Sequence, residues 1–146
     1  MEKKNILVIG GGASGMMAAI SALENGASVT ITEKESRLGK KVLVTGNGRC
    51  NLTNMNISSD NYHGCNPLFT NNVFAQFDNK QTIEFFNKLG VVTKVEERGR
   101  VFPMSDQASS VVDILTHRLK DLGVKLIYET KVESIEKNGN EFQITY

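Results

Sequence analysis

The sequence predicts an α/β fold in which helices connect the strands of a parallel sheet. Near the start, residues 5–9 form a short aliphatic run without alternation, which is typical of a parallel strand covered on both faces. Further along, three predicted helices each end in a glycine that leads directly into a predicted strand, at Gly26, Gly90 and Gly123. This repeated order favours crossover connections within a sheet.

Length and charge narrow the class of protein. The chain has 146 residues, of which 40% are hydrophobic and 23% charged, so we expect one domain over residues 1–146 and no second domain. The 17 basic and 16 acidic residues give a formal net charge of +1. Such a balance provides no broad field for nucleic acid or an anionic membrane, so neither is predicted as a partner.

Neither a membrane segment nor a metal site is predicted. The apolar run from Ile6 to Ile9 is too short for a membrane span or a signal peptide, which indicates a cytoplasmic protein. Cys50 and Cys65 are then expected to be reduced thiols. Their spacing fits neither a redox pair nor a zinc site.

The other elements are predicted from local patterns. Residues 34–72 are rich in Gly, Asn and Thr and too long for an idle connection, so we expect a functional loop with one short helix. Three helices are predicted, over 13–25, from the N-cap Asp78 to Leu89, and over 108–122 after Ser105. Further strands are predicted over 27–32, 91–95 and 124–128. A hairpin of 131–136 with 141–146, turned at Asn138-Gly139, is predicted at the end.

A glycine-rich turn follows the first strand and has the form G-x-G-x-x-G. Gly10 permits the sharp turn, Gly12 allows a pyrophosphate to approach the backbone, and Gly15 allows close packing of helix on strand. No acidic residue precedes Glu24 in the helix, so its N-terminus is open to a diphosphate. The motif predicts a dinucleotide-binding, Rossmann-like unit, although such glycines also make tight turns in proteins without nucleotide.

An acidic residue completes this fingerprint. Glu33 ends the second predicted strand, 18 residues after Gly15, where its carboxylate can accept hydrogen bonds from ribose hydroxyls. A carboxylate repels a 2′-phosphate, so NADP is disfavoured at this position. The pattern does not separate FAD from NAD.

A second glycine-containing loop follows, with flexible backbone at Gly46 and Gly48. It carries basic side chains suited to phosphate and amides suited to a polar ring edge, which are Lys40, Lys41 and Arg49, and Asn47, Asn51 and Asn54. The alternative interpretation is a solvated, turn-rich loop.

Three segments together resemble a known family. They are Val8-Ile9-Gly10-Gly11-Gly12-Ala13-Ser14-Gly15, Thr45-Gly46-Asn47-Gly48-Arg49-Cys50-Asn51 and Gly99-Arg100-Val101-Phe102-Pro103. The chain is similar to bacterial NAD(P)/FAD-dependent oxidoreductases of the aminoacetone-oxidase-like, or HI0933-like, flavoproteins with two dinucleotide-binding domains. Family members are much longer, so the chain resembles only their N-terminal part and lacks their insert domain and the C-terminal segment that closes on the flavin.

The resemblance implies an FAD site and assigns residues to it. The glycine turn takes the pyrophosphate, Glu33 the adenosine ribose, the 45–51 loop the flavin side, and backbone near Val132 the adenine. The predicted cofactor-binding residues are Gly10, Gly12, Ala13, Ser14, Gly15, Glu33, Lys34, Lys41, Thr45, Gly46, Asn47, Gly48, Arg49, Cys50, Asn51 and Val132.

Catalytic residues are not identified by the sequence. Cys50 follows Arg49, which would lower the pKa of a redox-active thiol, whereas ordinary packing is the alternative. Arg100 either approaches the cofactor or lies in an exposed turn. His63 lies in the predicted loop, where a ligand contact is one alternative, and His117 lies on a polar helix face, where it is expected to be solvated.

Three functions are consistent with these observations. The first is the FAD-binding portion of a flavin-dependent oxidoreductase that transfers hydride or electrons through the isoalloxazine, with NAD(P)H as a candidate donor and an unknown small-molecule substrate. The second is an NAD-dependent dehydrogenase domain. The third is an inactive folded fragment or interaction module. In every case little turnover is expected from this length of chain alone.

Overall fold

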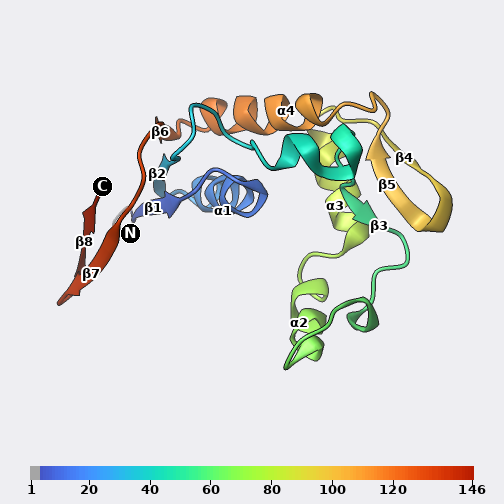
Figure 1. Cartoon of the computed structure of the whole chain (residues 1–146), viewed down its shortest axis with the longest axis horizontal. Helices are drawn as coiled ribbons and strands as arrows, with labels where there is room; N and C mark the ends of the chain where they lie inside the picture. Colours follow the sequence, from blue (N-terminus) through green and yellow to red (C-terminus); the bar gives the residue numbers. More distant parts are fainter. Residues whose placement is uncertain (1–3) are drawn as a thin grey trace. The chain divides into compact units, whose positions relative to one another are not determined.

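A computed structural model describes residues 4–146 of the chain (Figure 1). These residues divide into two compact units, one comprising the chain up to Val42 and from Leu115 to Tyr146, the other comprising Leu43–Ile114. The prediction that residues 1–146 form a single cofactor-binding domain stays a prediction. Within residues 4–146, no helix has the length and apolar character needed to cross a membrane.

The first unit contains the predicted parallel sheet. Strands β1 (Asn5–Ile9), β2 (Ser28–Thr32) and β6 (Lys125–Ile127) pair in the order β1-β2-β6, and helix α1 (Ala13–Glu24) connects the first two. Parallel strands need such a crossover, because a tight turn can only join antiparallel ones. The predicted Rossmann-like α/β fold is therefore confirmed.

The core of this unit lies around β2. Ile31 is 0% exposed at the centre of the sheet, and α1 packs against β1 and β2. The prediction that the first strand is covered on both faces is wrong. β1 pairs only with β2 among the described residues, and three of its side chains, Ile6, Leu7 and Ile9, are 36%, 38% and 47% exposed.

Helix α4 (Ala108–Asp121) has the predicted amphipathic pattern. The predicted apolar side chains are buried except Leu122, which is half-buried; the buried ones are Ala108, Val111, Val112, Leu115 and Leu119. A stripe repeated every three or four residues is what one buried helix face requires. Gly123 ends the helix, with φ of +80°, and β6 follows as predicted.

The chain ends in a hairpin of β7 (Ser134–Asn138) and β8 (Glu141–Thr145), as predicted. Its turn differs from the prediction by one residue. Asn138 pairs with Glu141, so the two turn residues are Gly139 and Asn140 rather than Asn138 and Gly139. Gly139 has φ of +63°, and the first turn position of such a hairpin favours this conformation.

The second unit contains an antiparallel sheet that the sequence did not reveal. Strands β3 (Thr53–Asn54), β4 (Thr93–Val95) and β5 (Arg100–Pro103) pair in the order β3-β5-β4. The prediction that Gly90 leads from a helix into a strand of the parallel sheet is therefore wrong, because its strand, β4, belongs to this antiparallel sheet. Hydrophobic pattern alone does not specify the direction in which a strand pairs.

Helix α3 (Asn79–Lys88) begins where the sequence predicts. The Asp78 carboxylate accepts a hydrogen bond from the Gln81 amide at 2.8 Å, and the Gln81 side chain accepts one from the Asp78 amide at 2.9 Å. This reciprocal capping satisfies two amides that the helix itself leaves unpaired.

The predicted loop over 34–72 holds more structure than expected. Instead of one short helix it contains β3 and four short helical segments: the 3₁₀ segments η1 (Val42–Gly48), η2 (Ser59–Asn61) and η3 (Pro67–Phe69), and α2 (Thr70–Phe74). Single turns of this kind are too short to produce a periodic sequence pattern. A fourth 3₁₀ segment, η4 (Glu97–Gly99), lies between β4 and β5.

Stability of the first unit should depend on β2. We predict that Ile31→Ala lowers the free energy of unfolding by about 2–5 kcal/mol, because it leaves a cavity in the core. The matched control, Ile135→Ala, removes a side chain that is 55% exposed and should cost less than about 1 kcal/mol. Urea unfolding followed by far-UV circular dichroism measures both, and equal losses would contradict this assignment of the core.

Candidate functional site

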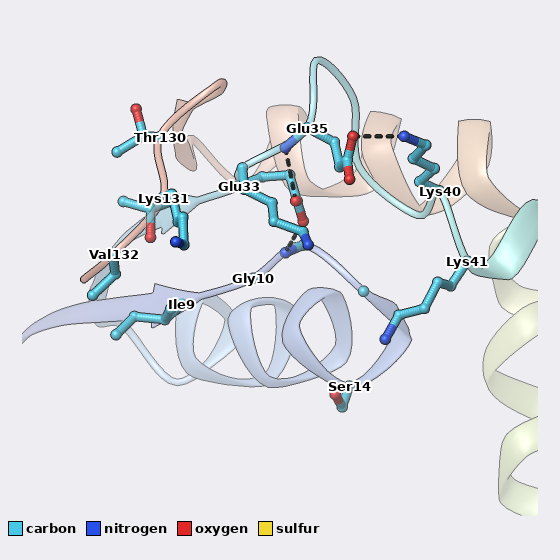
Figure 2. A pocket seen from close by; sticks show the side chains of 14 residues that line it. Ile9, Gly10, Ser14, Glu33, Glu35, Lys40, Lys41, Thr130, Lys131 and Val132 are labelled. Atoms are coloured by element: carbon cyan, nitrogen blue, oxygen red, sulfur yellow. Dashed lines mark hydrogen bonds and ion pairs between the residues drawn. The ribbon is translucent and has the colours of Figure 1, made fainter. Parts of the chain in front are cut away.

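A cleft of about 480 Å³ opens in the first unit, beside the carboxyl ends of β1 and β2 and the start of α1 (Figure 2). In open parallel sheets this edge is where ligands bind. Seven of the predicted cofactor-binding residues line this cleft: Gly10, Gly12, Ser14, Glu33, Lys34, Lys41 and Val132. Ala13 and Gly15 lie in the first turns of α1 and are not part of the lining.

The glycine turn has one glycine required by packing and one that opens the cleft. A Cβ at Gly15 would lie 1.9 Å from the Gly10 carbonyl oxygen, so only glycine lets α1 begin so close to β1. A Cβ at Gly12 would meet nothing within 4 Å. Gly12 is also the N-cap of α1, where no side chain caps the helix and no acidic residue occupies the first turn. The positive end of the helix dipole therefore faces the cleft without a capping side chain or an acidic residue in its own first turn.

Glu33 is held over this turn by backbone amides. The residue is 9% exposed. One carboxylate oxygen accepts a hydrogen bond from the Gly11 amide at 2.7 Å, and the other accepts one from the Glu35 amide at 3.0 Å (Figure 2). Each carboxylate oxygen has a further lone pair, so both can still accept a hydrogen bond from a ligand hydroxyl.

A buried hydroxyl lies next to Glu33. Thr32 is 2% exposed and lines the same cleft, and its Oγ1 has no hydrogen-bond partner within residues 4–146. A buried polar atom without a partner is uncommon in folded proteins.

Gly11 is a functional position that the motif left unassigned. A Cβ there would lie 2.2 Å from Leu38 Cδ2, and Leu38 is 2% exposed. The Gly39 amide donates to the Gly11 carbonyl at 2.8 Å. The segment after β2 thus packs directly on the glycine turn. The available signal in the sequence was the glycine at the middle position of Gly10-Gly11-Gly12, where the motif permits any residue.

Lysines surround the cleft, but they are not equivalent. Lys40 forms an ion pair with Glu35 at 2.6 Å, so its charge is locally balanced. Figure 2 shows Lys41 extending toward the end of α1 that carries Ser14. Lys41 therefore adds positive potential at the helix N-terminus.

The far wall of the cleft comes from the segment after β6. The Thr130 amide donates to the Glu33 carbonyl at 3.0 Å, which brings Thr130, Lys131 and Val132 to the lining. The sequence predicted Val132 but missed Thr130 and Lys131. No local pattern marks them, because their position depends on a pairing between segments distant in the sequence.

The predicted loop from Thr45 to Asn51 belongs to the second unit, and none of its residues lines this cleft. Within its unit, Arg49 is paired with the carboxylates of Glu96 at 2.9 Å and Asp106 at 3.4 Å. Its role as a cofactor ligand stays a prediction.

Cys50 differs from the sequence-based hypothesis. The side chain is 6% exposed, and burial raises the pKa of the thiol, although a hydrogen bond with Thr45 partly opposes this. Arg49 directs its charge to two carboxylates and is not among the groups that lower the pKa of Cys50. The hypothesis of an Arg49-activated thiolate is therefore wrong, because desolvation disfavours the charged form.

The other candidate side chains lie outside this cleft. Arg100 begins β5 in the second unit, where it donates to the Glu97 carbonyl at 3.2 Å, so its segment is a strand rather than an exposed turn. His63 is exposed in the second unit. His117 lies 3.4 Å from Asp121 on the exposed face of α4.

Two curated proteins are similar in sequence to this chain. The chain is 45% identical over 139 residues to the 3-dehydro-bile acid delta(4,6)-reductase of Clostridium scindens, covering 94% of this chain and 34% of that one. It is 30% identical over 144 residues to the ribosomal RNA dihydrouridine synthase of Escherichia coli, covering 99% of this chain and 36% of that one. The chain thus spans about a third of the length of these curated relatives.

Solved structures match the fold at low sequence identity. The 3-ketosteroid-delta4-(5alpha)-dehydrogenase of Rhodococcus jostii matches with a TM-score of 0.62 and 15% identity, over 99% of this chain and 44% of that one. Thermovibrio ammonificans THI4 matches with a TM-score of 0.63 and 12% identity, over 97% and 45%. The family model described as the HI0933-like protein Rossmann domain matches residues 4–146, so the chain belongs to this family.

Proposed function

We propose that the cleft of the first unit binds the ADP half of FAD, and that the chain is the FAD-binding portion of a flavin-dependent oxidoreductase. One observation carries this proposal. The uncapped N-terminus of α1 and the buried carboxylate of Glu33 lie in the same cleft. A diphosphate and an adjacent ribose need these two features together.

The lining fits this ligand in size and chemistry. A volume of about 480 Å³ is typical of a small-molecule site. Gly12 leaves room for the diphosphate and Lys41 adds a counter-charge, while Glu33 accepts from the ribose hydroxyls and rejects a 2′-phosphate. Ile9 and Val132 offer an apolar surface to the adenine.

The relatives suggest the reaction class. The activities that name these two relatives, reduction of a 3-dehydro delta(4,6) bile acid and formation of dihydrouridine, both concern a carbon–carbon double bond conjugated to a carbonyl. A bound flavin supplies hydride or electron transfer to such a bond. We therefore propose an activated alkene as substrate class and NAD(P)H as electron donor, and the residues described here bind and orient the cofactor.

Between the two kinds of substrate, a small apolar molecule is favoured over RNA. Identity to the bile acid reductase is 45%, against 30% to the dihydrouridine synthase. The formal net charge of +1 also gives this chain little general attraction for a polynucleotide.

Glycine substitutions test the cofactor site. Gly12→Ala should lower stability by no more than about 1 kcal/mol, because Gly12 is an N-cap whose added Cβ would meet no protein atom, yet weaken FAD binding by about tenfold or more by blocking the diphosphate. Gly15→Ala, the matched variant, should lower both stability and binding, because its Cβ would clash with backbone. Calorimetric titration with FAD and thermal unfolding provide the two readouts.

Three outcomes of that titration would argue against the proposal. FAD binding that is unchanged in Gly12→Ala excludes this cleft. Binding of NAD in preference to FAD indicates the dehydrogenase alternative. A folded wild-type chain that binds neither dinucleotide indicates a fragment or interaction module.

Chimeras test which relative's cofactor domain this chain can replace. We predict that replacing the matching third of the Clostridium scindens reductase with this chain retains its reductase activity within about tenfold, since the identity over this segment is 45% and the domain holds the cofactor. The matching replacement in the Escherichia coli dihydrouridine synthase is the control and should lose more activity, since the identity there is 30%. The reverse order, in chimeras that both retain FAD, would relate this chain to the dihydrouridine synthase instead.

A further inference from the structure

We infer that Arg49 is a positioning residue, which fixes the shape of the loop from Thr45 to Asn51 through carboxylates and an aromatic ring and does not act as a phosphate ligand. The inference rests on the proposed function only where FAD is used as a probe. Its structural basis lies entirely within the second unit.

Four charged side chains form a closed ring, here called the four-charge cluster: Arg49, Lys94, Glu96 and Asp106. Arg49 contacts Glu96 at 2.9 Å and Asp106 at 3.4 Å, and Lys94 contacts the same two residues at 3.3 Å and 2.5 Å. Each charge thus touches two opposite charges. Two cations balance two anions, so the cluster has no excess positive charge to offer a phosphate.

The groups of the cluster are partly shielded from water. Their side chains are between 26% and 42% exposed. The hydrogen bond from Arg49 lowers the pKa of Glu96, and the hydrogen bond from Lys94 lowers the pKa of Asp106, so both carboxylates stay charged at neutral pH. A ring of several charges is better organised than an isolated surface pair.

Phe102 connects Arg49 to the start of the loop. The ring is 2% exposed, and the Arg49 guanidinium lies 4.0 Å from its centroid. At Gly46 a Cβ would lie 2.9 Å from Phe102 Cε1 and 2.7 Å from the Asn51 amide nitrogen. The same ring therefore supports the loop at Gly46 and at Arg49.

The loop needs this support because its backbone is unfavourable. Asn47 and Cys50 adopt φ of +57° and +62°, a left-handed conformation that costs free energy for residues other than glycine. Asp106, the acceptor of two cluster contacts, has φ of +54°. Such conformations persist only where surrounding contacts impose them, and Arg49 lies directly beside Cys50.

Cys50 reports on the loop without any cofactor. In a Cys65→Ser background, which removes the exposed thiol, Cys50 is the remaining cysteine and is buried. We expect Glu96→Gln and Arg49→Met to raise the rate at which a disulfide reagent labels Cys50 by about tenfold, because the loop opens locally. The control Glu84→Gln breaks an exposed pair with Lys88 in the same unit and should change the rate less than about twofold.

Labelling that is unchanged in both cluster variants, while circular dichroism shows a folded chain, overturns the inference. If either variant fails to fold, Asp106→Asn replaces it, since Asp106 makes the longer of the two contacts to Arg49. Asp106→Asn must then raise the labelling rate above that of Glu84→Gln.

FAD affinity separates positioning from direct anion binding. Glu96→Gln removes a negative charge and leaves Arg49 paired with Asp106 alone, so a phosphate-ligand role for Arg49 requires tighter FAD binding. A positioning role requires FAD binding that is unchanged or weaker, because the variant then offers the ligand no newly available charge. If the wild-type chain does not bind FAD, the proposed function fails, and the Cys50 labelling alone decides the role of Arg49.

Discussion

The contact between Gly15 and the Gly10 carbonyl is the constraint on which the first unit depends. A Cβ would lie 1.9 Å from that oxygen, so α1 can start directly at the end of β1 only with glycine. This closeness sets the direction of α1 and the position of its open N-terminus. The carboxyl end of β2 then comes alongside, since the Gly10 amide donates to the Thr32 carbonyl at 2.8 Å. Glu33 follows immediately in the sequence, and its carboxylate accepts a hydrogen bond from the Gly11 amide.

Local rules predicted much of the fold. The capped start of α3 at Asp78, the buried stripe of α4 and the glycine turn depend on neighbours in the sequence, and all three were identified correctly. Gly90 shows where such rules end. Its strand joins an antiparallel sheet with β5, and no periodicity distinguishes that partner from the parallel sheet.

The residues of the candidate site divide in the same way, into those that a local motif identifies and those that long-range pairing brings to the cleft. Gly12 and Glu33 could be predicted, because the motif fixes their spacing and each has a task defined by the ligand. Thr130 and Lys131 could not, since a backbone pairing with Glu33 brings them to the cleft. Arg49 illustrates a third case. Its charge was visible in the sequence, but its partners Glu96 and Asp106 lie about fifty residues away, so the ion pairs that balance this charge were not.

Strand β1 has a consequence for the behaviour of this polypeptide in solution. Within residues 4–146 it is paired on one side only, and Ile6, Leu7 and Ile9 are all more than a third exposed. An aliphatic strand with unpaired amides and carbonyls is a template for intermolecular pairing. We therefore expect concentrated samples to self-associate along this edge of β1, and an added strand that paired there would complete the sheet and suppress the association.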